Sequence, residues 1–273
     1  MIDGARLALR RARFRHKTLR APLVRWRHHR LSAHDVFLAA YPRSGTTWLR
    51  FLFFETLTGQ EAAFGRVRAA VPSVGEHRRA RPVLPDGGRL VQTHERYRDG
   101  DRRVVYVVRD VRSVVVSEYA WQRRARFFTG TLEGFIEDFL AGRTNPWGTW
   151  DDHIRFWGAT PATRSDRVYV LRYEDLRRST EEEFTRALTW LGAHPSAATV
   201  RAAIHHNSLE AMRAKQQMAR APVDGSRRQP TTVVGAGSTR AWRASLAPEQ
   251  IAAIERRFGP TLQALGYELE TVV

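Results

Sequence analysis

The sequence predicts a single α/β domain with a central parallel sheet flanked by helices. Short apolar runs recur along the chain and predict buried strands at residues 36–40, 90–94, 104–108 and 168–171. Amphipathic stretches separate most of these runs, and strands that alternate with helices are typical of a parallel sheet. In such a sheet ligands bind beyond the carboxyl ends of the strands, so the residues that follow each run are the first candidates for a site.

The composition suits one large folded domain, or one domain with an appendage. The chain has 273 residues, of which 42% are hydrophobic, which is ample for a core. It contains no cysteine, which excludes disulfides, thiol chemistry and cysteine-ligated metals. No apolar stretch approaches the length of a membrane span, and the start lacks the apolar core of a secretory signal. A cytoplasmic protein is therefore expected.

The formal charge of +17 is concentrated at the N-terminus, where residues 1–30 hold nine arginines and Lys17 against Asp3 alone. We therefore divide the chain into a basic arm, residues 1–31, and a domain, residues 32–273. The arm has two interpretations. It is a solvated basic helix or frayed terminus, or it attaches the protein to an anionic membrane surface, since leucine, phenylalanine and tryptophan side chains interleave with the charges.

The first predicted strand ends at Tyr41-Pro42, because proline cannot continue a central strand. An amphipathic run begins at Trp48. A strand that enters a small-residue turn and opens a helix makes an anion site, because free backbone N–H groups and the positive helix end point at the ligand. The common GxxxxGK[ST] loop is absent, and no lysine is near. The turn consists of Arg43, Ser44, Gly45, Thr46 and Thr47.

The remaining elements follow from periodicity and from helix breakers. Residues 59–88 are polar and repeatedly interrupted by glycine and proline, which predicts mostly loop. The pattern predicts helices at about 113–124, at two short stretches within 131–160 separated by Asn145-Pro146, at 181–191 and at 250–265. Four chemically useful side chains then lie at the carboxyl ends of four different predicted strands, namely Arg43, His94, Arg109 and Tyr173.

The segment from Tyr41 to Trp48 resembles the 5′-phosphosulfate-binding motif of sulfotransferases that use 3′-phosphoadenosine 5′-phosphosulfate (PAPS). That motif reads Tyr-Pro-Lys-Ser-Gly-Thr-Thr-Trp, and Arg43 stands where many members have lysine. The resemblance implies a P-loop-like phosphosulfate-binding loop that comprises Arg43, Ser44, Gly45, Thr46, Thr47 and Trp48.

A second segment, residues 106–119, resembles the family's 3′-phosphate-binding segment. Arg109 ends a strand and Ser117 follows eight positions later. An arginine offers a planar fork to a phosphate dianion, and a serine on the following helix adds a hydroxyl donor. The alternative for Arg109-Asp110 is a surface ion pair.

Weaker matches concern the base and the C-terminal part of the chain. Tyr173 and Trp48 resemble the family's adenine contacts, although either side chain could be core, and residues 207–212 resemble a further nucleotide-side segment. Residues 235–243 fit the family's Arg-Lys-Gly…Trp-Lys pattern in length, but its two basic residues are replaced. The replacing residues are Gly235 and Ala236, and the candidates to substitute for the lost contacts are Arg240, or Arg227 with Arg228.

The resemblance of residues 92–95 to the family's Lys-Thr-His segment implies that His94 is the general base. Histidine suits this role because its ordinary pKa lies near the working pH. Glu95 is a rival base on the opposite face of the strand. The other nine histidines are interpreted as solvated or arm residues, because none ends a predicted strand. Arg43 is assigned electrostatic stabilisation rather than acid catalysis, because arginine stays charged.

The resemblance implies in-line transfer of a sulfuryl group from PAPS to a hydroxyl, or less readily an amine, of a small-molecule or glycan acceptor, with no metal. The alternatives are a P-loop-like phosphoryl-transfer enzyme and a basic membrane- or nucleic-acid-binding protein. Nucleic acid is not favoured as a partner. Five aromatic residues either line an acceptor cleft or belong to the core, namely Trp121, Phe127, Phe128, Trp147 and Trp150.

Overall fold

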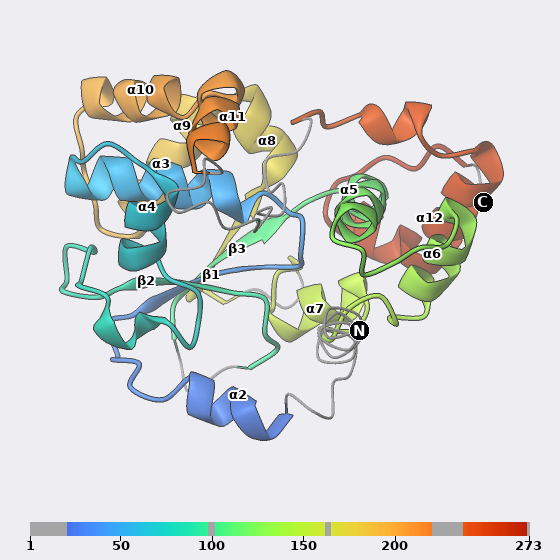
Figure 1. Cartoon of the computed structure of the whole chain (residues 1–273), viewed down its shortest axis with the longest axis horizontal. Coiled ribbons are helices and arrows are strands. Elements are labelled where there is room, and N and C mark those ends of the chain that lie inside the picture. Colours follow the sequence, from blue (N-terminus) through green and yellow to red (C-terminus); the bar gives the residue numbers. More distant parts are fainter. Residues whose placement is uncertain (1–20, 98–101, 162–164, 220–236, 272–273) are drawn as a thin grey trace, which may run out of the picture.

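The sheet has four strands, all parallel, in the order β2-β1-β3-β4 (Figure 1). The computed structural model describes residues 21–97, 102–161, 165–219 and 237–271. The four predicted strands and the parallel α/β class are confirmed, and strand bounds differ from the prediction by one residue at most. The strands are β1 (Val36–Ala40), β2 (Leu90–Thr93), β3 (Val104–Val108) and β4 (Val168–Arg172).

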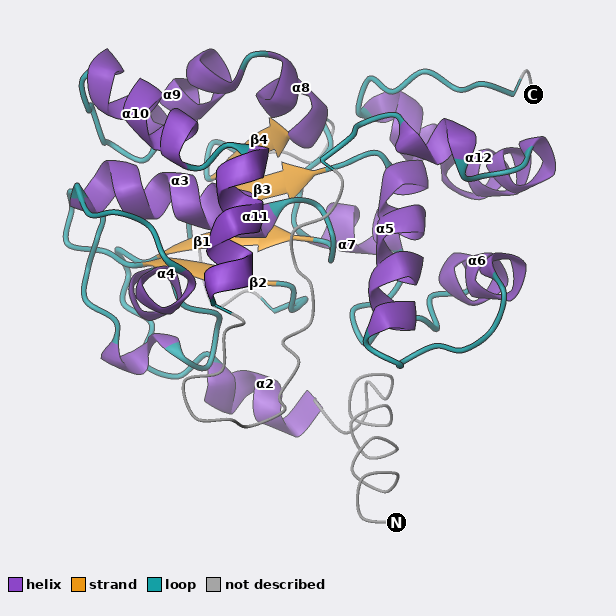
Figure 2. Cartoon of the chain, turned by 45° about the horizontal axis from the view of Figure 1, so that its top comes forward, coloured by secondary structure: helices purple, strands orange, loops and turns teal. Residues whose placement is uncertain are grey.

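Both faces of the sheet are buried, because β1 and β3 have no exposed residue and their side chains alternate between two apolar clusters. Helices cover both faces (Figure 2). One cluster includes residues of α5 (Val111–Arg124), α6 (Leu132–Leu140), α7 (Trp150–Phe156) and α12 (Pro248–Ala264). The other includes residues of α3 (Thr46–Thr58), α4 (Phe64–Ala70), α8 (Tyr173–Arg178), α9 (Thr180–Trp190), α10 (Ala197–His206) and α11 (Leu209–Met218).

The helices predicted within 113–124, 131–160, 181–191 and 250–265 are confirmed. The expectation that residues 59–88 are mostly loop is confirmed, and α4 and the 3₁₀ turn His77–Arg79 are the short helical segments within this stretch. Gly65 sits in the first turn of α4, where a glycine costs little, and no proline interrupts the helix. The breakers of this stretch therefore mark the boundaries of α4 rather than an absence of helix.

Three histidines that were interpreted as solvated or arm residues are buried. The interpretation is wrong for His77 and His153, whereas His28 belongs to the arm but is not solvated. His28 is 2% exposed, and His77 and His153 are fully buried. Both ring nitrogens of His153 pair with groups that are remote in the sequence, namely the Tyr106 hydroxyl and the His94 carbonyl. The partners of a buried histidine therefore come from tertiary packing, which single-residue patterns do not reveal.

The strand order places a crevice between β1 and β3. The chain leaves β1 for β2 on one side and then returns to β3 on the other, and ligands of open parallel sheets bind where the order reverses in this way. Helix α3 begins six residues after the end of β1. Arg109 directly follows β3, and α5 begins two residues after Arg109. The two segments singled out by the sequence therefore face each other across this crevice.

Helix α2 (Ala21–Arg27) lies in the part of the basic arm that the structure describes. The Arg27 side chain donates to the Val74 carbonyl at 2.6 Å and pairs with Glu95 at 2.9 Å. On its outer side, Leu23 and Trp26 are 47% and 60% exposed. In the residues that the structure describes, no helix is both long and apolar enough to cross a membrane.

Candidate active site

The loop after β1 adopts a backbone that few residues tolerate. Arg43 has φ 68°, a left-handed conformation that is uncommon for a non-glycine residue and that clusters at ligand sites. Gly45 has φ 99° and precedes the first residue of α3. A Cβ on Gly45 would lie 2.6 Å from ring carbons of Tyr173, so only glycine lets the loop pack against that ring.

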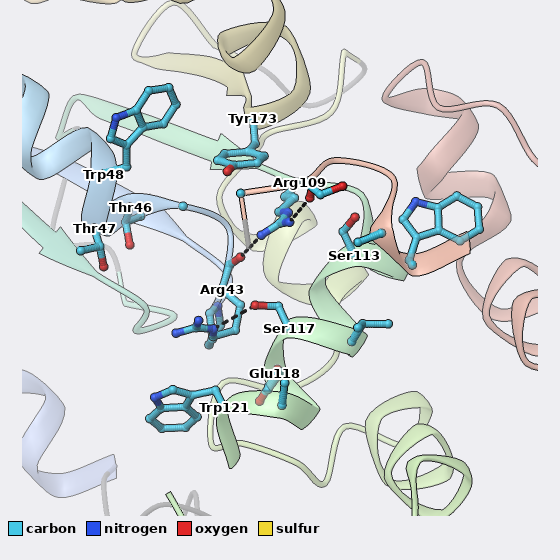
Figure 3. A pocket seen from close by; sticks show the side chains of 18 of the residues that line it. Arg43, Thr46, Thr47, Trp48, Arg109, Ser113, Ser117, Glu118, Trp121 and Tyr173 are labelled. Atoms are coloured by element: carbon cyan, nitrogen blue, oxygen red, sulfur yellow. Dashed lines mark hydrogen bonds between the residues drawn. The ribbon is translucent and has the colours of Figure 1, made fainter. Parts of the chain in front are cut away.

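This loop forms one wall of a cavity of about 590 Å³ (Figure 3). The cavity brings together nearly all the residues that the sequence assigned to binding or catalysis. Ser44 is the exception: it is 1% exposed, does not line the cavity, and its hydroxyl has no hydrogen-bond partner in the described part of the chain. The predicted residues on the wall are Arg43, Gly45, Thr46, Thr47, Trp48, His94, Arg109, Ser117 and Tyr173.

Arg109 lies on the cavity wall and contacts three separate segments of the chain. Its Nη1 donates to the Arg43 carbonyl at 3.0 Å and its Nη2 to the Ser238 carbonyl at 3.1 Å, while the guanidinium lies 4.5 Å from the centre of the Tyr173 ring. Its Nε is buried without a partner. Asp110 pairs with Arg112 at 2.8 Å, so the alternative Arg109–Asp110 ion pair is not formed. Arg109 is therefore held at the crevice with one donor still unused.

Ser117 lies on the face of α5 that looks into the cavity, and its hydroxyl accepts a hydrogen bond from Arg43 Nε at 3.2 Å. The Arg43 guanidinium lies 5.9 Å from the Trp121 ring. Burial lowers the pKa of Arg43 to about 10, so the side chain still carries its charge at neutral pH. A positive charge and a hydroxyl thus meet at the centre of the cavity.

The side of the cavity beside α8 is aromatic. Trp48 and Tyr173 meet edge to face with ring centres 6.4 Å apart, and Trp48 Nε1 donates to the Asn207 carbonyl at 2.9 Å. The Arg177 guanidinium lies 5.2 Å from the Trp48 ring. Arg177 was missed by the sequence reasoning, although it stands four residues after Tyr173 and therefore on the same face of a helix.

His94 lines the cavity together with Trp147, whose ring centre lies 5.5 Å away. His94 Nδ1 donates to the Ala40 carbonyl at 2.6 Å, since a carbonyl can only accept. The neutral ring then carries its lone pair on Nε2. His153 Nε2 donates to the His94 carbonyl at 3.0 Å, and burial lowers the pKa of His153 to about 3, so this supporting ring stays neutral.

Glu95, the rival base, does not line the cavity. It is 5% exposed and pairs with Arg27 at 2.9 Å and with His28 at 3.6 Å. Glu118 is instead the carboxylate on the cavity wall among the described residues. It is fully buried, and burial raises its pKa to about 7. The sequence offered no signal for it beyond its place after Ser117.

The five aromatic candidates for the acceptor cleft divide between cavity and core. Trp121 and Trp147 line the cavity, whereas Trp150 is fully buried in the apolar cluster that Phe128 also contacts. Phe127 is 8% exposed and packs on Trp121 with ring centres 5.5 Å apart. Other wall residues that the sequence reasoning did not assign to the site include Ser113, Arg124, Arg177, Ser238, Ala241 and Trp242.

The C-terminal segment closes the cavity on the side of α5. Ser113 Oγ donates to the Thr239 carbonyl at 3.1 Å, and Trp242 is 3% exposed. Arg240 is not on the cavity wall. Gly235, Ala236, Arg227 and Arg228 lie outside the described residues. In the described ranges, no group of three or more histidine, aspartate or glutamate side chains is arranged to hold a metal ion.

Comparison with known proteins agrees with this geometry. The chain is 28% identical over 200 residues to sulfotransferase 1A1 of Mus musculus, covering 66% of this chain and 67% of that protein. It is 25% identical over 215 residues to sulfotransferase 1C2 of Oryctolagus cuniculus, covering 70% of each.

Solved structures share the fold. The crystal structure of mouse sulfotransferase SULT7A1 complexed with PAP superposes with a TM-score of 0.64 at 19% identity, covering 85% of each chain. Retinol dehydratase in complex with retinol and PAP superposes with a TM-score of 0.67 at 18% identity, covering 89% of this chain and 84% of that one. The sulfotransferase domain family matches residues 33–266, so the chain belongs to that family and is a sulfotransferase.

Proposed function

We propose that this sulfotransferase takes the sulfuryl group from PAPS and transfers it to the hydroxyl of a small molecule, with His94 as the general base. One observation carries the proposal. A loop with left-handed residues at Arg43 and Gly45 faces Arg109, Ser117 and His94 across a single cavity. The alternative of a phosphoryl-transfer enzyme is disfavoured by the family match and by the absence of a Walker lysine.

The donor half of the cavity suits an adenosine carrying two anionic groups. The N-terminus of α3 and the hydroxyls of Thr46 and Thr47 would hold the phosphosulfate, as helix ends hold anions. Arg109, whose Nε is buried without a partner, and Ser117 would hold the 3′-phosphate. Trp48 and Tyr173 would contact the base. PAPS supplies the activated sulfuryl group; no side chain needs to form a covalent intermediate.

The roles of the central residues follow from their geometry. His94 keeps its Nδ1 proton on the Ala40 carbonyl, which leaves Nε2 to accept a proton from an acceptor hydroxyl at the cavity wall. Arg43 holds a fixed positive charge where negative charge develops, and a preorganised charge of this kind needs no rearrangement during the reaction. Relatives of the fold include a retinol dehydratase bound to androsterone, which supports a small hydroxyl compound as acceptor.

The basic arm is proposed to bring the enzyme to an anionic membrane surface at the cytoplasmic side. Leu23 and Trp26 are exposed on α2, and the arginines and Lys17 of residues 1–20 precede them in the chain. Apolar side chains among basic ones favour the interface of anionic lipid. The remaining chain, from about residue 32 onward, would be the catalytic domain.

Ligand identity tests the proposed function directly. The bisphosphate 3′,5′-ADP should raise the melting temperature well above any shift from ATP or AMP, because a ligand that binds only the folded state stabilises it by about 2.7 kcal/mol at a hundredfold excess over Kd. Arg109→Ala should remove this preference. Equal shifts with ATP and 3′,5′-ADP would argue against PAPS as the donor.

A further inference from the structure

One arginine on the cavity wall has no role in the proposed binding of the donor. Four arginines line the cavity, Arg43, Arg109, Arg124 and Arg177, and Glu118 is the carboxylate on its wall. Burial raises the pKa of Glu118 to about 7, so this group is only partly ionised near neutral pH. The arginine that the donor does not use is therefore available to an anionic group on the acceptor.

The arginines separate by position into donor and acceptor sides. Arg109 contacts Tyr173, and Arg177 lies over Trp48, so both belong to the proposed nucleotide half. Figure 3 shows Trp121 on the opposite side of Arg43 from Tyr173 and Arg109. Arg124 follows Trp121 by three residues on α5, so it lies on that same side, away from the nucleotide.

The face of α5 that lines the cavity changes character along its length. Ser113 and Ser117 come first, Trp121 follows, and Arg124 ends the helix. Arg124 lies seven residues past Ser117, which is about 10 Å along a helix axis. An acceptor that extends along this face of α5, from Ser117 past Trp121, would thus reach Arg124 with its far end.

Arg124 has no hydrogen bond or ion pair to any described residue, although it is exposed at the cavity wall. Its neighbour Arg123 differs. Arg123 Nη1 donates to the carbonyls of Thr129 and Gly130 at 3.0 and 3.1 Å, so its guanidinium serves the fold. Both residues sit in the last turn of α5, where a positive charge stabilises the helix dipole. That common effect cannot explain why only Arg124 is directed to the cavity.

We propose that Arg124 is a specificity-determining residue that selects aromatic hydroxyl acceptors carrying a carboxylate or another anionic group at the end remote from the hydroxyl. This inference rests on the proposed function, because it assigns the class of acceptor to the same site. A guanidinium can bind a carboxylate with two parallel hydrogen bonds, and the strongly basic protein would also attract such acceptors over longer distances.

The test compares two acceptors of equal length, 3-(4-hydroxyphenyl)propionate and its neutral amide, 3-(4-hydroxyphenyl)propionamide. KM is measured for both with saturating PAPS, and Kd is measured for both by calorimetry with the protein saturated by 3′,5′-ADP. The wild type should favour the propionate by roughly fivefold, the size expected for a partly exposed charged pair, and added salt should reduce this preference.

Arg124→Gln should abolish the preference by weakening binding of the propionate alone, with kcat and the KM for the amide nearly unchanged. Arg123→Gln, the matched control, should retain the preference. Equal affinity of the wild type for both compounds, or equal effects of the two substitutions, would overturn the assignment of Arg124. If the Kd preference holds but neither compound is sulfated, the anionic subsite stands and the proposed transfer to the hydroxyl of a small phenol fails.

Discussion

His94 and Glu95 are adjacent in the chain but end in different surroundings. His94 lies on the cavity wall with its Nδ1 proton fixed by the Ala40 carbonyl, whereas Glu95 is buried beside Arg27 and His28. Adjacent side chains of an extended strand point to opposite faces, so one face supplies the site and the other holds α2. The sequence pattern predicted the separation, and the structure adds which face is the cavity.

Replacing His94 with alanine should therefore lower kcat by roughly 10²–10⁴, the usual size of general-base catalysis, with little change in affinity for 3′,5′-ADP. Glu95→Gln should lower the stability of the protein, because Arg27 loses its partner, while the folded enzyme keeps most of its kcat. The measurement needs an aliphatic alcohol as acceptor, since an acidic phenol hardly requires a base. A larger loss of kcat in Glu95→Gln than in His94→Ala would contradict the assignment.

Glu118 should make the stability of the folded protein depend on pH. Its Oε1 accepts from Gln122 and Asn145 at 3.0 and 2.9 Å, and the oxygen of a glutamine could accept the same two bonds. Burial raises the pKa of Glu118 from 4.5 to about 7, so the folded state holds a proton that the unfolded chain has already released. The wild type therefore loses stability as the pH rises from about 4.5 to 7, and the loss is complete above that range.

Glu118→Gln does not titrate and should escape this loss. Its free energy of unfolding relative to wild type should increase between pH 5 and pH 8 by up to about 3 kcal/mol, the equivalent of the pKa change. Urea unfolding of both proteins at several pH values measures the difference. A difference independent of pH would mean that Glu118 has a nearly ordinary pKa in the folded state.

Among the elements, the loop between β1 and α3 depends on contact with the start of α8. Gly45→Ala should lower affinity for 3′,5′-ADP by at least tenfold, because the added Cβ would lie 2.6 Å from the Tyr173 ring and either the loop or the ring must move.

Gly59→Ala, at the other end of α3, is the matched control. Gly59 has φ 66° with no atom within 4 Å of an added Cβ, so this variant should lose stability through backbone strain and retain nucleotide affinity. Calorimetry and melting temperatures separate the two effects, and equal affinities in both variants would refute the coupling of the loop to Tyr173.

The elements also show which parts of the fold and of the site can be predicted from the sequence. The strands were predictable because buried parallel strands are short continuous apolar runs, and the residues that follow them were predictable because parallel strands end at one edge. Helices α10 and α11 were not predicted. Wall residues such as Arg177, Arg124 and Trp242 reach the cavity from helix faces and from a C-terminal turn, and their position depends on packing between distant segments. Site residues at strand ends are therefore the ones that can be predicted from the sequence.

At the scale of the whole molecule, the uneven charge predicts a membrane-dependent behaviour. The full-length protein should bind vesicles that contain phosphatidylserine, and binding should weaken as salt is raised, because the attraction is screened. Deleting residues 1–20, which hold six arginines and Lys17, should reduce binding strongly while turnover of a water-soluble acceptor stays nearly unchanged. Vesicle sedimentation and a sulfation assay give the two readouts. This deletion retains Arg27 and His28, which pack on the domain, and equal vesicle binding with and without residues 1–20 would count against the membrane role.

The strand order has a consequence for how quickly the enzyme becomes active. Val36 pairs with Leu90, Phe37 with Val104, and Val104 with Val168, so every strand pairing joins residues more than 50 positions apart. Pairings over such distances form slowly, because the chain must close large loops before it gains any contact. The nucleotide half needs β1, β3 and β4 together, since Gly45 and Tyr173 meet only when those strands are aligned. Catalytic competence should therefore be the last property regained on refolding, well after helix content, and a newly made chain would remain inactive until residues beyond Tyr173 had been synthesised.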